Sequence, residues 1–219
     1  MAMNLTVDVI SDVICPWCFI GKRRLEKAVA TLDAAHEVRV RWLPFQLNSQ
    51  MPKEGVSRRE YRIRKFGSWE RSLELDAQVA AAGKAEGILF AFDRMERTPN
   101  TLDAHRLIWL ADTEGVQDAV VEALFRAYFT EGRDISARQT LLDVVAEAGL
   151  DRVKAEGVLN SAGGEEAIRE ADELYRRVRV EGVPFFVFNG KVTLSGAQPP
   201  EAFLAAFRQA SGEDSHRKA

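Results

Sequence analysis

The sequence predicts an α/β fold in which a large block of helices interrupts a smaller mixed sheet. Three observations support this prediction. Apolar and polar residues alternate near both ends of the chain, whereas apolar residues in the middle recur at helical spacing. An Asn-Gly pair separates two strand-like runs near the C-terminus. The predicted order of elements is therefore β-α-β, a series of helices, and then β-β-α.

Residues 1–56 contain the predicted β-α-β segment. Residues 5–9 alternate in the manner of a half-buried strand, and apolar residues at helical spacing in residues 25–32 predict a helix. Pro16 suits the first turn of that helix, where its missing N–H costs no hydrogen bond. Residues 38–42 alternate again and predict a second strand. Crossovers of this kind are almost always right-handed.

Residues 57–181 are predicted to form an all-helical insertion, with no strand. A long helix is expected over residues 57–82. Asn100 or Thr98 is expected to cap the next helix. Residues 136–139 match a capping box that would open a later helix. Three of the later helices are expected to end at glycine residues, namely Gly115, Gly132 and Gly149.

Residues 182–210 contain the predicted β-β-α segment. Two strands, residues 185–188 and 191–194, flank Asn189-Gly190, the preferred two-residue hairpin turn. Pro200 lies at the start of a final helix. Without the insertion, the two ends of the chain have the order of elements of a thioredoxin fold.

Composition narrows the class of protein. The chain has 219 residues, 46% of them hydrophobic, and a net charge of −3, which is ordinary for a globular protein. We expect no nucleic-acid partner at this charge and no membrane partner, because no run of about 18 apolar residues occurs. The N-terminus lacks the features of a secretory signal, so a cytoplasmic protein is expected. Residues 211–219 are expected to be a disordered polar tail.

The cysteine pair carries the chemistry. Cys15 and Cys18 are the only two cysteines, separated by Pro16 and Trp17. A free cysteine with a pKa of about 8.5 is mostly protonated at neutral pH, and the start of a helix favours the reactive thiolate. Cys15 is therefore predicted to attack a disulfide, and Cys18, one turn further in and more buried, to resolve the mixed disulfide.

A metal site is the main rival interpretation, because zinc sites also use two cysteines at this spacing. A structural zinc ion needs four ligands. Beyond the pair, the sequence offers only His36, His105 and His216 as further soft ligands. We therefore predict no metal and expect His105 to be a packed histidine.

Three segments resemble a known family. Residues 13–21, around the cysteine pair, resemble the active-site stretch of the DsbA-like thioredoxin family, in its FrnE-like branch. Gly182-Val183-Pro184-Phe185-Phe186 is similar to the cis-proline loop of that family. Residues 100–107 resemble a stretch shared with 2-hydroxychromene-2-carboxylate isomerases and kappa-class glutathione transferases. The matches follow the family order along nearly the whole chain.

The resemblance implies a substrate-binding groove around the cysteines. It implies that Pro184 is cis and packs against Cys15, which would leave the Val183 backbone free to pair with an extended substrate. From sequence alone, an ordinary proline at the start of a strand fits equally well. Asn48 and Asn100 are implied contacts for a peptide or glutathione backbone, although Asn100 could simply cap its helix.

Two further features bear on the substrate. Trp17 lies between the cysteines, where there is little room for burial, so we expect it to be exposed and to touch the substrate beside Pro16. Residues 58–65 are locally basic. A nucleic-acid site would use such a basic helix face. Because the net charge of the whole chain is negative, we favour a solvated helix face that borders a site for anionic glutathione.

The predicted function is thiol–disulfide exchange with protein or small-thiol partners, with glutathione as a potential co-substrate and no other cofactor. The isomerase and transferase relatives have serine where this chain has Cys15, which argues for redox exchange. A glutathione-dependent isomerase or transferase acting on a small aromatic compound is the alternative enzyme. A peptide-binding chaperone-like module or a cluster-bridging dimer is the alternative without catalysis. The direction of exchange is left open. The oligomeric state is also left open, and a homodimer is one option.

Overall fold

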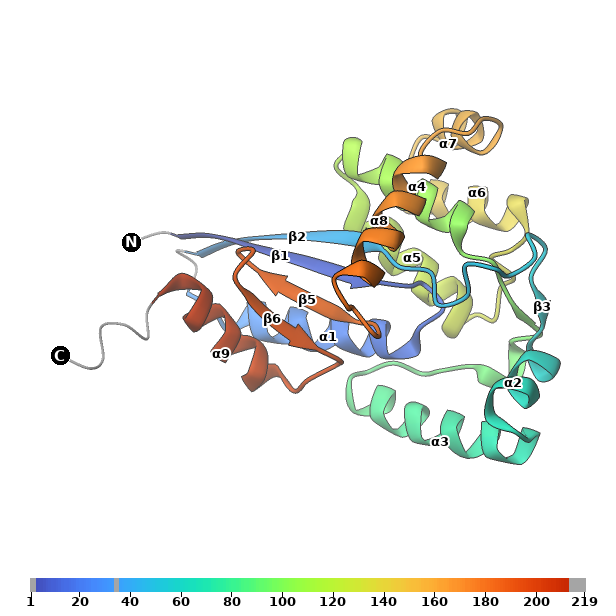
Figure 1. The fold of residues 1–219 in the computed structure, drawn as a ribbon, viewed down its shortest axis with the longest axis horizontal. Helices are drawn as coiled ribbons and strands as arrows, with labels where there is room; N and C mark the ends of the chain where they lie inside the picture. The colour runs from blue at the N-terminus through green and yellow to red at the C-terminus, as the bar shows by residue number, and fades with distance from the viewer. Residues whose placement is uncertain (1–2, 34–35, 213–219) are drawn as a thin grey trace.

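The structure is a computed structural model that describes residues 3–33 and 36–212 (Figure 1). Its sheets and helices follow one another in the order β-α-β, a helical block, and β-β-α. The strands are β1 (Met3–Ser11), β2 (His36–Pro44), β3 (Val56–Ser57), β4 (Arg97–Thr98), β5 (Phe185–Phe188) and β6 (Val192–Ser195). The helices are α1 (Pro16–Ala30), α2 (Arg58–Phe66), α3 (Trp69–Ala85), α4 (Leu102–Thr113), α5 (Gln117–Phe129), α6 (Arg138–Glu147), α7 (Arg152–Leu159), α8 (Glu165–Arg177) and α9 (Pro200–Ser211), with a short 3-10 turn η1 (Phe92–Arg94).

The main sheet has four strands in the order β2-β1-β5-β6. Strands β1 and β2 are parallel and are joined through α1, whereas β5 and β6 form an antiparallel hairpin against the other edge of β1. The hairpin turns at Asn189 and Gly190, which both have positive φ. The second hairpin strand begins at Val192, which pairs with Phe188, and not at Lys191 as predicted. The central strand β1 is buried, as Val7 and Val9 are 0% exposed.

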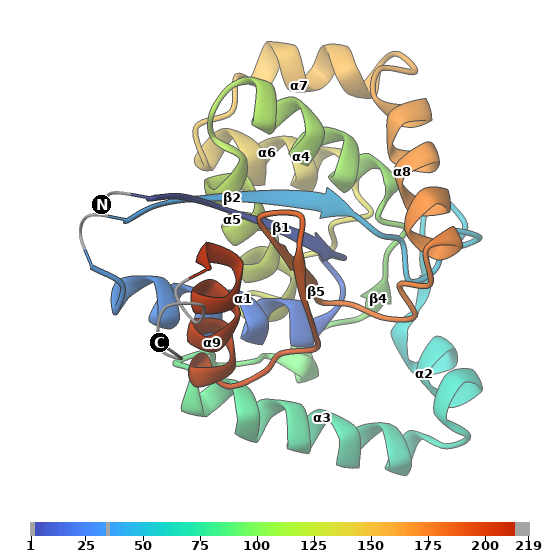
Figure 2. The ribbon, with the colours of Figure 1, turned by 60° about the vertical axis from the view of Figure 1, so that its left-hand side comes forward.

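Helices α1 and α9 lie side by side on one face of this sheet (Figure 2). Aromatic rings from β5 and α9 join the layers: the centroids of Phe186 and Phe203 lie 4.8 Å apart, and those of Phe188 and Phe207 lie 5.0 Å apart. Pro16 occupies the first turn of α1, as predicted. This packing fixes the start of α1 beside the end of β1.

The helical block packs against β2 and α1. Phe19 of α1 stacks on Phe125 of α5 with a centroid separation of 5.1 Å, and Trp42 of β2 meets the same ring edge-on at 6.2 Å. The indole N–H of Trp42 also donates to Asp118 at 2.9 Å. One continuous apolar core therefore joins the sheet layers to the inserted helices.

The structure confirms the predicted thioredoxin fold with a large helical insertion. The prediction that the insertion contains no strand is wrong, because β3 and β4 pair in a small antiparallel sheet. Two residues on each strand are too few to produce a recognisable alternation. The single long helix predicted over residues 57–82 is also wrong. Gly67, with a φ of 91°, ends α2, and the Ser68 side chain caps the separate helix α3.

The predicted capping box at residues 136–139 is not formed. Helix α6 starts after Ala137 without a side-chain cap, and the Ser136 hydroxyl instead donates to Asp134 at 2.6 Å. The Ser136 side chain therefore bonds to Asp134 and does not cap α6. Most of the predicted polar tail, residues 213–219, lies outside the described residues, as does His216. None of the helices in the described part of the chain combines the length and apolar character needed to cross a membrane.

Candidate functional site

The two cysteines lie at the N-terminal end of α1. Cys15 is the residue before the helix, with extended φ and ψ of −94° and 110°, and Pro16 follows as its first helical residue. The Cys15 N–H donates to the Asp12 carbonyl at 3.0 Å, and the Cys18 N–H donates to the Cys15 carbonyl at 3.0 Å. Both cysteines are free thiols.

The two thiols differ in environment. Cys15 is 5% exposed and Cys18 is 0% exposed, so Cys18 is the more buried of the two, as predicted. Burial, assisted by the hydrogen bond and charge of Cys15, raises the pKa of Cys18 well above its ordinary value. Cys18 is therefore held as a thiol, while Cys15 borders the surface.

The loop before β5 contacts the outer cysteine. The Val183–Pro184 peptide bond is cis. The Cys15 thiol donates to the Val183 carbonyl over 3.4 Å. On the helix side, Gly21 of α1 leaves room for Pro184: a Cβ at Gly21 would lie 3.1 Å from the Pro184 ring. The fold thus brings residues 15 and 183 together from opposite ends of the chain.

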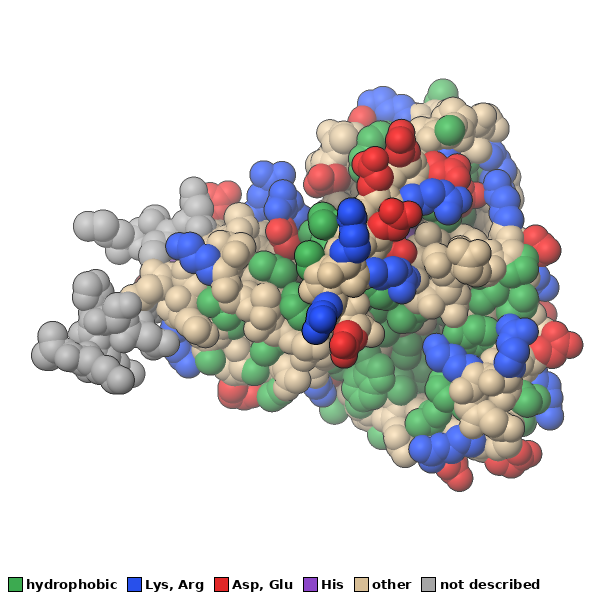
Figure 3. All heavy atoms as spheres, in the orientation of Figure 1, with side chains coloured by type: hydrophobic (Ala, Val, Ile, Leu, Met, Phe, Trp, Pro, Cys, Tyr) green, Lys and Arg blue, Asp and Glu red, His purple; other side chains and the backbone are tan. Residues whose placement is uncertain are grey.

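A cavity of about 270 Å³ opens beside Cys15, between the start of α1 and helices α2 and α3. Cys15, Pro16, Trp17 and Asn48 all line it. The remaining wall is largely apolar and includes Leu47, Phe66, Val79, Phe92 and Phe129. Figure 3 shows hydrophobic side chains gathered in a hollow in this part of the surface, bordered by Lys and Arg side chains. Trp17, at its rim, is 40% exposed, as predicted.

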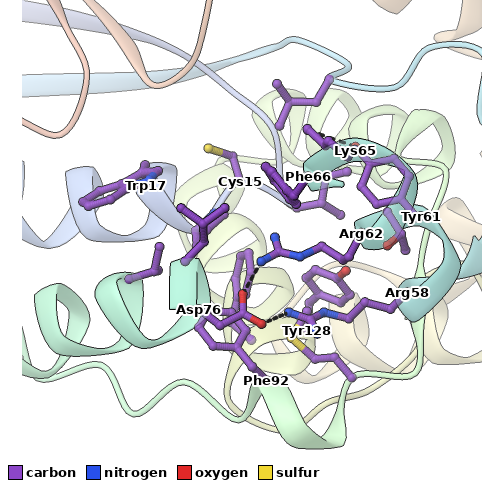
Figure 4. Close-up of a pocket in the computed structure, with 18 of the residues that line it drawn as sticks. Cys15, Trp17, Arg58, Tyr61, Arg62, Lys65, Phe66, Asp76, Phe92 and Tyr128 are labelled. Atoms are coloured by element: carbon purple, nitrogen blue, oxygen red, sulfur yellow. Dashed lines mark hydrogen bonds and ion pairs between the residues drawn. The ribbon is translucent and has the colours of Figure 1, made fainter. Parts of the chain in front are cut away.

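Positive charge exceeds negative charge on the α2 side of this cavity (Figure 4). Arg58 and Arg62 both bind Asp76 of α3, at 2.7 and 2.5 Å. Lys65 lines the same wall, where its ammonium group donates to the Tyr61 hydroxyl at 3.0 Å. Among the described residues that line the cavity, three cations thus face one carboxylate. The predicted basic segment is only partly a solvated face, because Arg58 is 4% exposed.

The predicted contacts Asn48 and Asn100 lie in different places. The side-chain Oδ1 of Asn48 accepts a hydrogen bond from the Tyr61 hydroxyl at 2.7 Å, while its buried Nδ2 has no hydrogen-bond partner among the described residues. Asn100 lines a separate cavity with Lys53 and Arg106. Its side chain bonds to the Met51 carbonyl and to the first N–H of α4. The structure therefore brings Asn48 to the cysteines and keeps Asn100 away from their cavity.

One buried polar pair beneath the cysteines was not predicted. Asp12 is 0% exposed and His105, a packed histidine as expected, is 2% exposed. The Asp12 carboxylate accepts the Leu47 N–H at 2.7 Å and lies 3.4 Å from His105 Nε2. An aspartate between a strand and the cysteine motif was the available signal in the sequence. Within residues 3–33 and 36–212, no three His, Cys, Asp or Glu side chains are arranged to hold a metal ion.

The chain is similar to known proteins along nearly its whole length. The profile of the DSBA-like thioredoxin domain matches residues 6–208. An uncharacterized Bacillus subtilis protein, YwbO, is 25% identical over 209 residues, which cover 93% of this chain and 96% of that protein.

Two solved structures extend this comparison. A probable DsbA oxidoreductase from Streptomyces coelicolor is 32% identical, with a TM-score of 0.88 and coverage of 95% of this chain and 91% of that one. The cytosolic disulfide reductase DsbM from Pseudomonas aeruginosa, described with GSH, has a TM-score of 0.67 at 19% identity, over 94% of this chain and 99% of its own. The second similarity concerns the fold alone.

Proposed function

This chain belongs to the DSBA-like thioredoxin domain family, and we propose that it exchanges thiols and disulfides through Cys15 and Cys18. The observation that carries the proposal is the asymmetry of the pair. Cys15 stands at a helix start beside the Val183 carbonyl at 3.4 Å, whereas Cys18 is fully buried one turn further in. This asymmetry supports a first attack on the substrate by Cys15 and a second step by Cys18.

The proposed reaction has two steps. The Cys15 thiolate attacks one sulfur of a substrate disulfide, forms a mixed disulfide and releases the other sulfur as a thiolate. The Cys18 sulfur then attacks Cys15, which closes the Cys15–Cys18 disulfide and releases the reduced substrate. Run in reverse, the oxidised pair delivers a disulfide to a dithiol. If instead a second thiolate of the substrate attacks the mixed disulfide, a new disulfide forms within the substrate, Cys15 leaves as a thiolate, and the substrate is isomerised without oxidation of Cys18.

Protein substrates have a suitable surface at the site. The loop at Val183 and Pro184 lies next to Cys15, and we propose that its backbone pairs with an extended segment of the substrate. Trp17, which is 40% exposed at the cavity rim, offers an aromatic contact beside Pro16. A cytosolic reducing pool would keep a pair of moderate potential mostly as dithiol, so we propose a reductase or isomerase role.

A small anionic thiol is the second candidate substrate. The cavity beside Cys15 carries Arg62 and Lys65, and its Asn48 Nδ2 is a buried donor without a partner among the described residues. These groups would suit the carboxylate and carbonyl oxygens of a molecule such as glutathione. Under this proposal the small thiol acts as reductant or co-substrate and not as a resident cofactor.

The test is an insulin-reduction assay and a dithiol-oxidation assay, with the redox potential measured in glutathione buffers. We expect exchange in at least one direction and its loss in Cys15→Ser. A glutathione-dependent isomerase or transferase would instead keep most of its turnover in Cys15→Ser. No exchange in either direction, with both thiols titratable, would contradict the proposal.

A further inference from the structure

Exposed arginines gather at the end of α8, shortly before the loop that contacts Cys15. Arg176, Arg177 and Arg179 follow one another closely, in a chain whose net charge is −3. Arg176 binds Asp172 at 2.9 Å. The side chains of Arg177 and Arg179 are exposed, and neither forms an ion pair or a hydrogen bond with another described residue. Figure 3 shows Lys and Arg side chains over this part of α8 and over α2, on either side of the hydrophobic hollow.

Helix electrostatics explain only part of this cluster. Cations are favoured at a helix C-terminus, and Arg176 and Arg177 lie in the last turn of α8. Arg179 lies beyond the helix, with a φ of 63°. The Val180 N–H donates to the Tyr175 carbonyl at 2.9 Å, so residue 179 is the left-handed residue of a helix-ending turn. Glycine suits that position without strain, so an arginine there costs stability, and no side-chain contact with the described residues offsets the cost.

The end of α8 is tied to the loop beside Cys15. Val180 is 5% exposed in a small apolar cluster at the end of β1, and Val183 packs against the same cluster. The Val183 carbonyl lies 3.4 Å from the Cys15 sulfur. Four residues of chain span at most about 14 Å, so the Cα atoms of Arg179 and Val183 lie within that distance. An extended substrate segment covers the same distance in about four residues.

Apolar side chains accompany the two unpaired arginines. Val178, between them, is 62% exposed. Leu174, one turn earlier on the same face of α8, is 47% exposed. We call the surface formed by Leu174, Arg177, Val178 and Arg179 the α8 patch. Its composition suits a peptide that mixes acidic and apolar residues.

One carboxylate limits the extent of the positive surface. Glu181 is exposed between Arg179 and Val183. The α8 patch is therefore short, unlike the continuous basic stripe along which a nucleic-acid backbone binds. A substrate that follows the loop would reach the arginines beyond Glu181.

We propose that the α8 patch binds an acidic segment of a protein substrate while the Val183 backbone pairs with the residues next to the substrate cysteine. This inference rests on the proposed exchange function and names its class of substrate. The substrate has acidic residues, mixed with apolar ones, about four to six positions from a disulfide-bonded cysteine. Complementary charge speeds encounter and fixes the register of the segment on the loop.

The test compares peptides that differ only in charge. Each peptide has one cysteine, blocked as an uncharged 2-pyridyl disulfide, and carries Glu, Gln or Lys about four to six positions away on both sides. Cys15 of the reduced full chain attacks the peptide sulfur, which forms the mixed disulfide and releases pyridine-2-thione, followed by stopped-flow absorbance. Each rate is divided by the rate of 2-mercaptoethanol with the same peptide, which corrects for the intrinsic reactivity of that peptide.

We expect the Glu peptide to react about tenfold faster than the Gln peptide at low salt, and the Lys peptide to be the slowest. The difference should shrink at about 0.5 M NaCl, because salt screens exposed charges. The double variant Arg177→Gln, Arg179→Gln should lose most of the difference and keep the wild-type rate with the Gln peptide. Arg179→Gly should also reduce the preference, and it should fold at least as stably as the wild type because glycine suits the left-handed position.

The double variant Arg39→Gln, Lys191→Gln is the matched control. Both side chains are exposed and form no ion pair or hydrogen bond with other described residues. Both lie near Thr6 of β1: Arg39 is its partner in the sheet, and Lys191 follows the hairpin turn that bonds to the Thr6 carbonyl. This variant loses the same charge away from the cysteines and should keep the preference for the Glu peptide.

Three kinetic results would overturn the inference: equal corrected rates for the Glu and Gln peptides, a preference that survives in the Arg177→Gln, Arg179→Gln variant, or the same loss of preference in the control. Tighter binding of a labelled single-stranded DNA than of the Glu peptide, through the same two arginines, would also overturn it by assigning the patch to a nucleic acid. Failure of the wild type to react with all three peptides, with both thiols titratable, would instead refute the exchange function, and this inference with it.

Discussion

Arg58 and Asp76 form a buried ion pair at 2.7 Å, with side chains only 5% and 9% exposed. The pair ties α2 to α3 at the back of the cavity beside Cys15. Arg62 shares the same carboxylate from the next turn of α2. The Asp76 carboxylate of α3 therefore holds two cations of α2, Arg58 and Arg62, in the wall of the cavity.

Asp76→Ala should destabilise the protein because it leaves Arg58 buried without its counter-charge. Removal of one partner of a buried pair costs about 3 kcal/mol or more in the free energy of unfolding. The matched control is Glu74→Ala on the same helix, which breaks an exposed pair with Arg71 and should cost less than about 0.5 kcal/mol. Urea unfolding measures both. Equal losses in the two variants would contradict the structural role given to Asp76.

Gly21→Ala should disturb the contact between α1 and the loop at Pro184. The new Cβ would lie 3.1 Å from the Pro184 ring and 3.1 Å from Phe186, so the loop must move by a few tenths of an ångström. Overpacking of this kind costs about 1–3 kcal/mol, and higher helix propensity offsets about 1 kcal/mol of it. We expect slower attack by Cys15 on a disulfide, measured by stopped-flow absorbance.

The control for that experiment is Gly157→Ala in α7, where a Cβ meets no atom within 4 Å. This variant should gain about 1 kcal/mol and react at the wild-type rate. If Gly21→Ala reacts as fast as Gly157→Ala, the position of the loop at Pro184 does not determine the rate at which Cys15 attacks a disulfide.

The cations of the cavity should select anionic small thiols. The double variant Arg62→Gln, Lys65→Gln should raise the KM for glutathione disulfide by more than about tenfold, since each hydrogen bond to a charged group contributes roughly 1.5–3 kcal/mol. Arg64→Gln, an exposed cation on the same helix that does not line the cavity, should leave KM unchanged. The KM of an uncharged peptide disulfide should not move in either variant. An equal KM increase for both substrates would point to a damaged site.

The raised pKa of Cys18 should make the reduced protein less stable at alkaline pH. Burial keeps the native Cys18 protonated above the ordinary pKa of a cysteine thiol, whereas the unfolded chain releases that proton. The unfolded state then binds fewer protons, so the free energy of unfolding falls as pH rises above that value. Thermal unfolding of the reduced wild type should show a steeper alkaline loss than Cys18→Ala. Parallel pH profiles would show that Cys18 ionises in the native state as it does in the unfolded chain.

The order of elements was predictable because each long element carries its own periodicity. The strand around Val7 alternates, the apolar run at residues 185–188 ends at the Asn189-Gly190 turn, and the stripe on α5 repeats at helical spacing. The β3–β4 pair was missed because two residues form no pattern, and its partners are far apart in the chain. The break at Gly67 was missed because apolar residues continue on both sides of it.

The site was predictable only where it is local in sequence. Cys15 and Cys18 are neighbours in the chain, so their spacing indicated the chemistry. The approach of Val183 to Cys15 was implied by family resemblance and not by any local pattern. The contact between Asp12 and His105 depends on how α4 packs beneath the end of β1, which no linear motif encodes.

The most direct test of the account is to trap the mixed disulfide. Reduced Cys18→Ser protein is mixed with a disulfide-bonded peptide, and the adduct is located by intact-mass and peptide mass spectrometry. The account predicts one peptide attached through Cys15, an adduct that persists until a reductant is added, and none on Cys15→Ser protein, whose buried Cys18 does not meet the substrate. An adduct on Cys18 of the Cys15→Ser protein, or none on either variant, would contradict the roles given to the two cysteines.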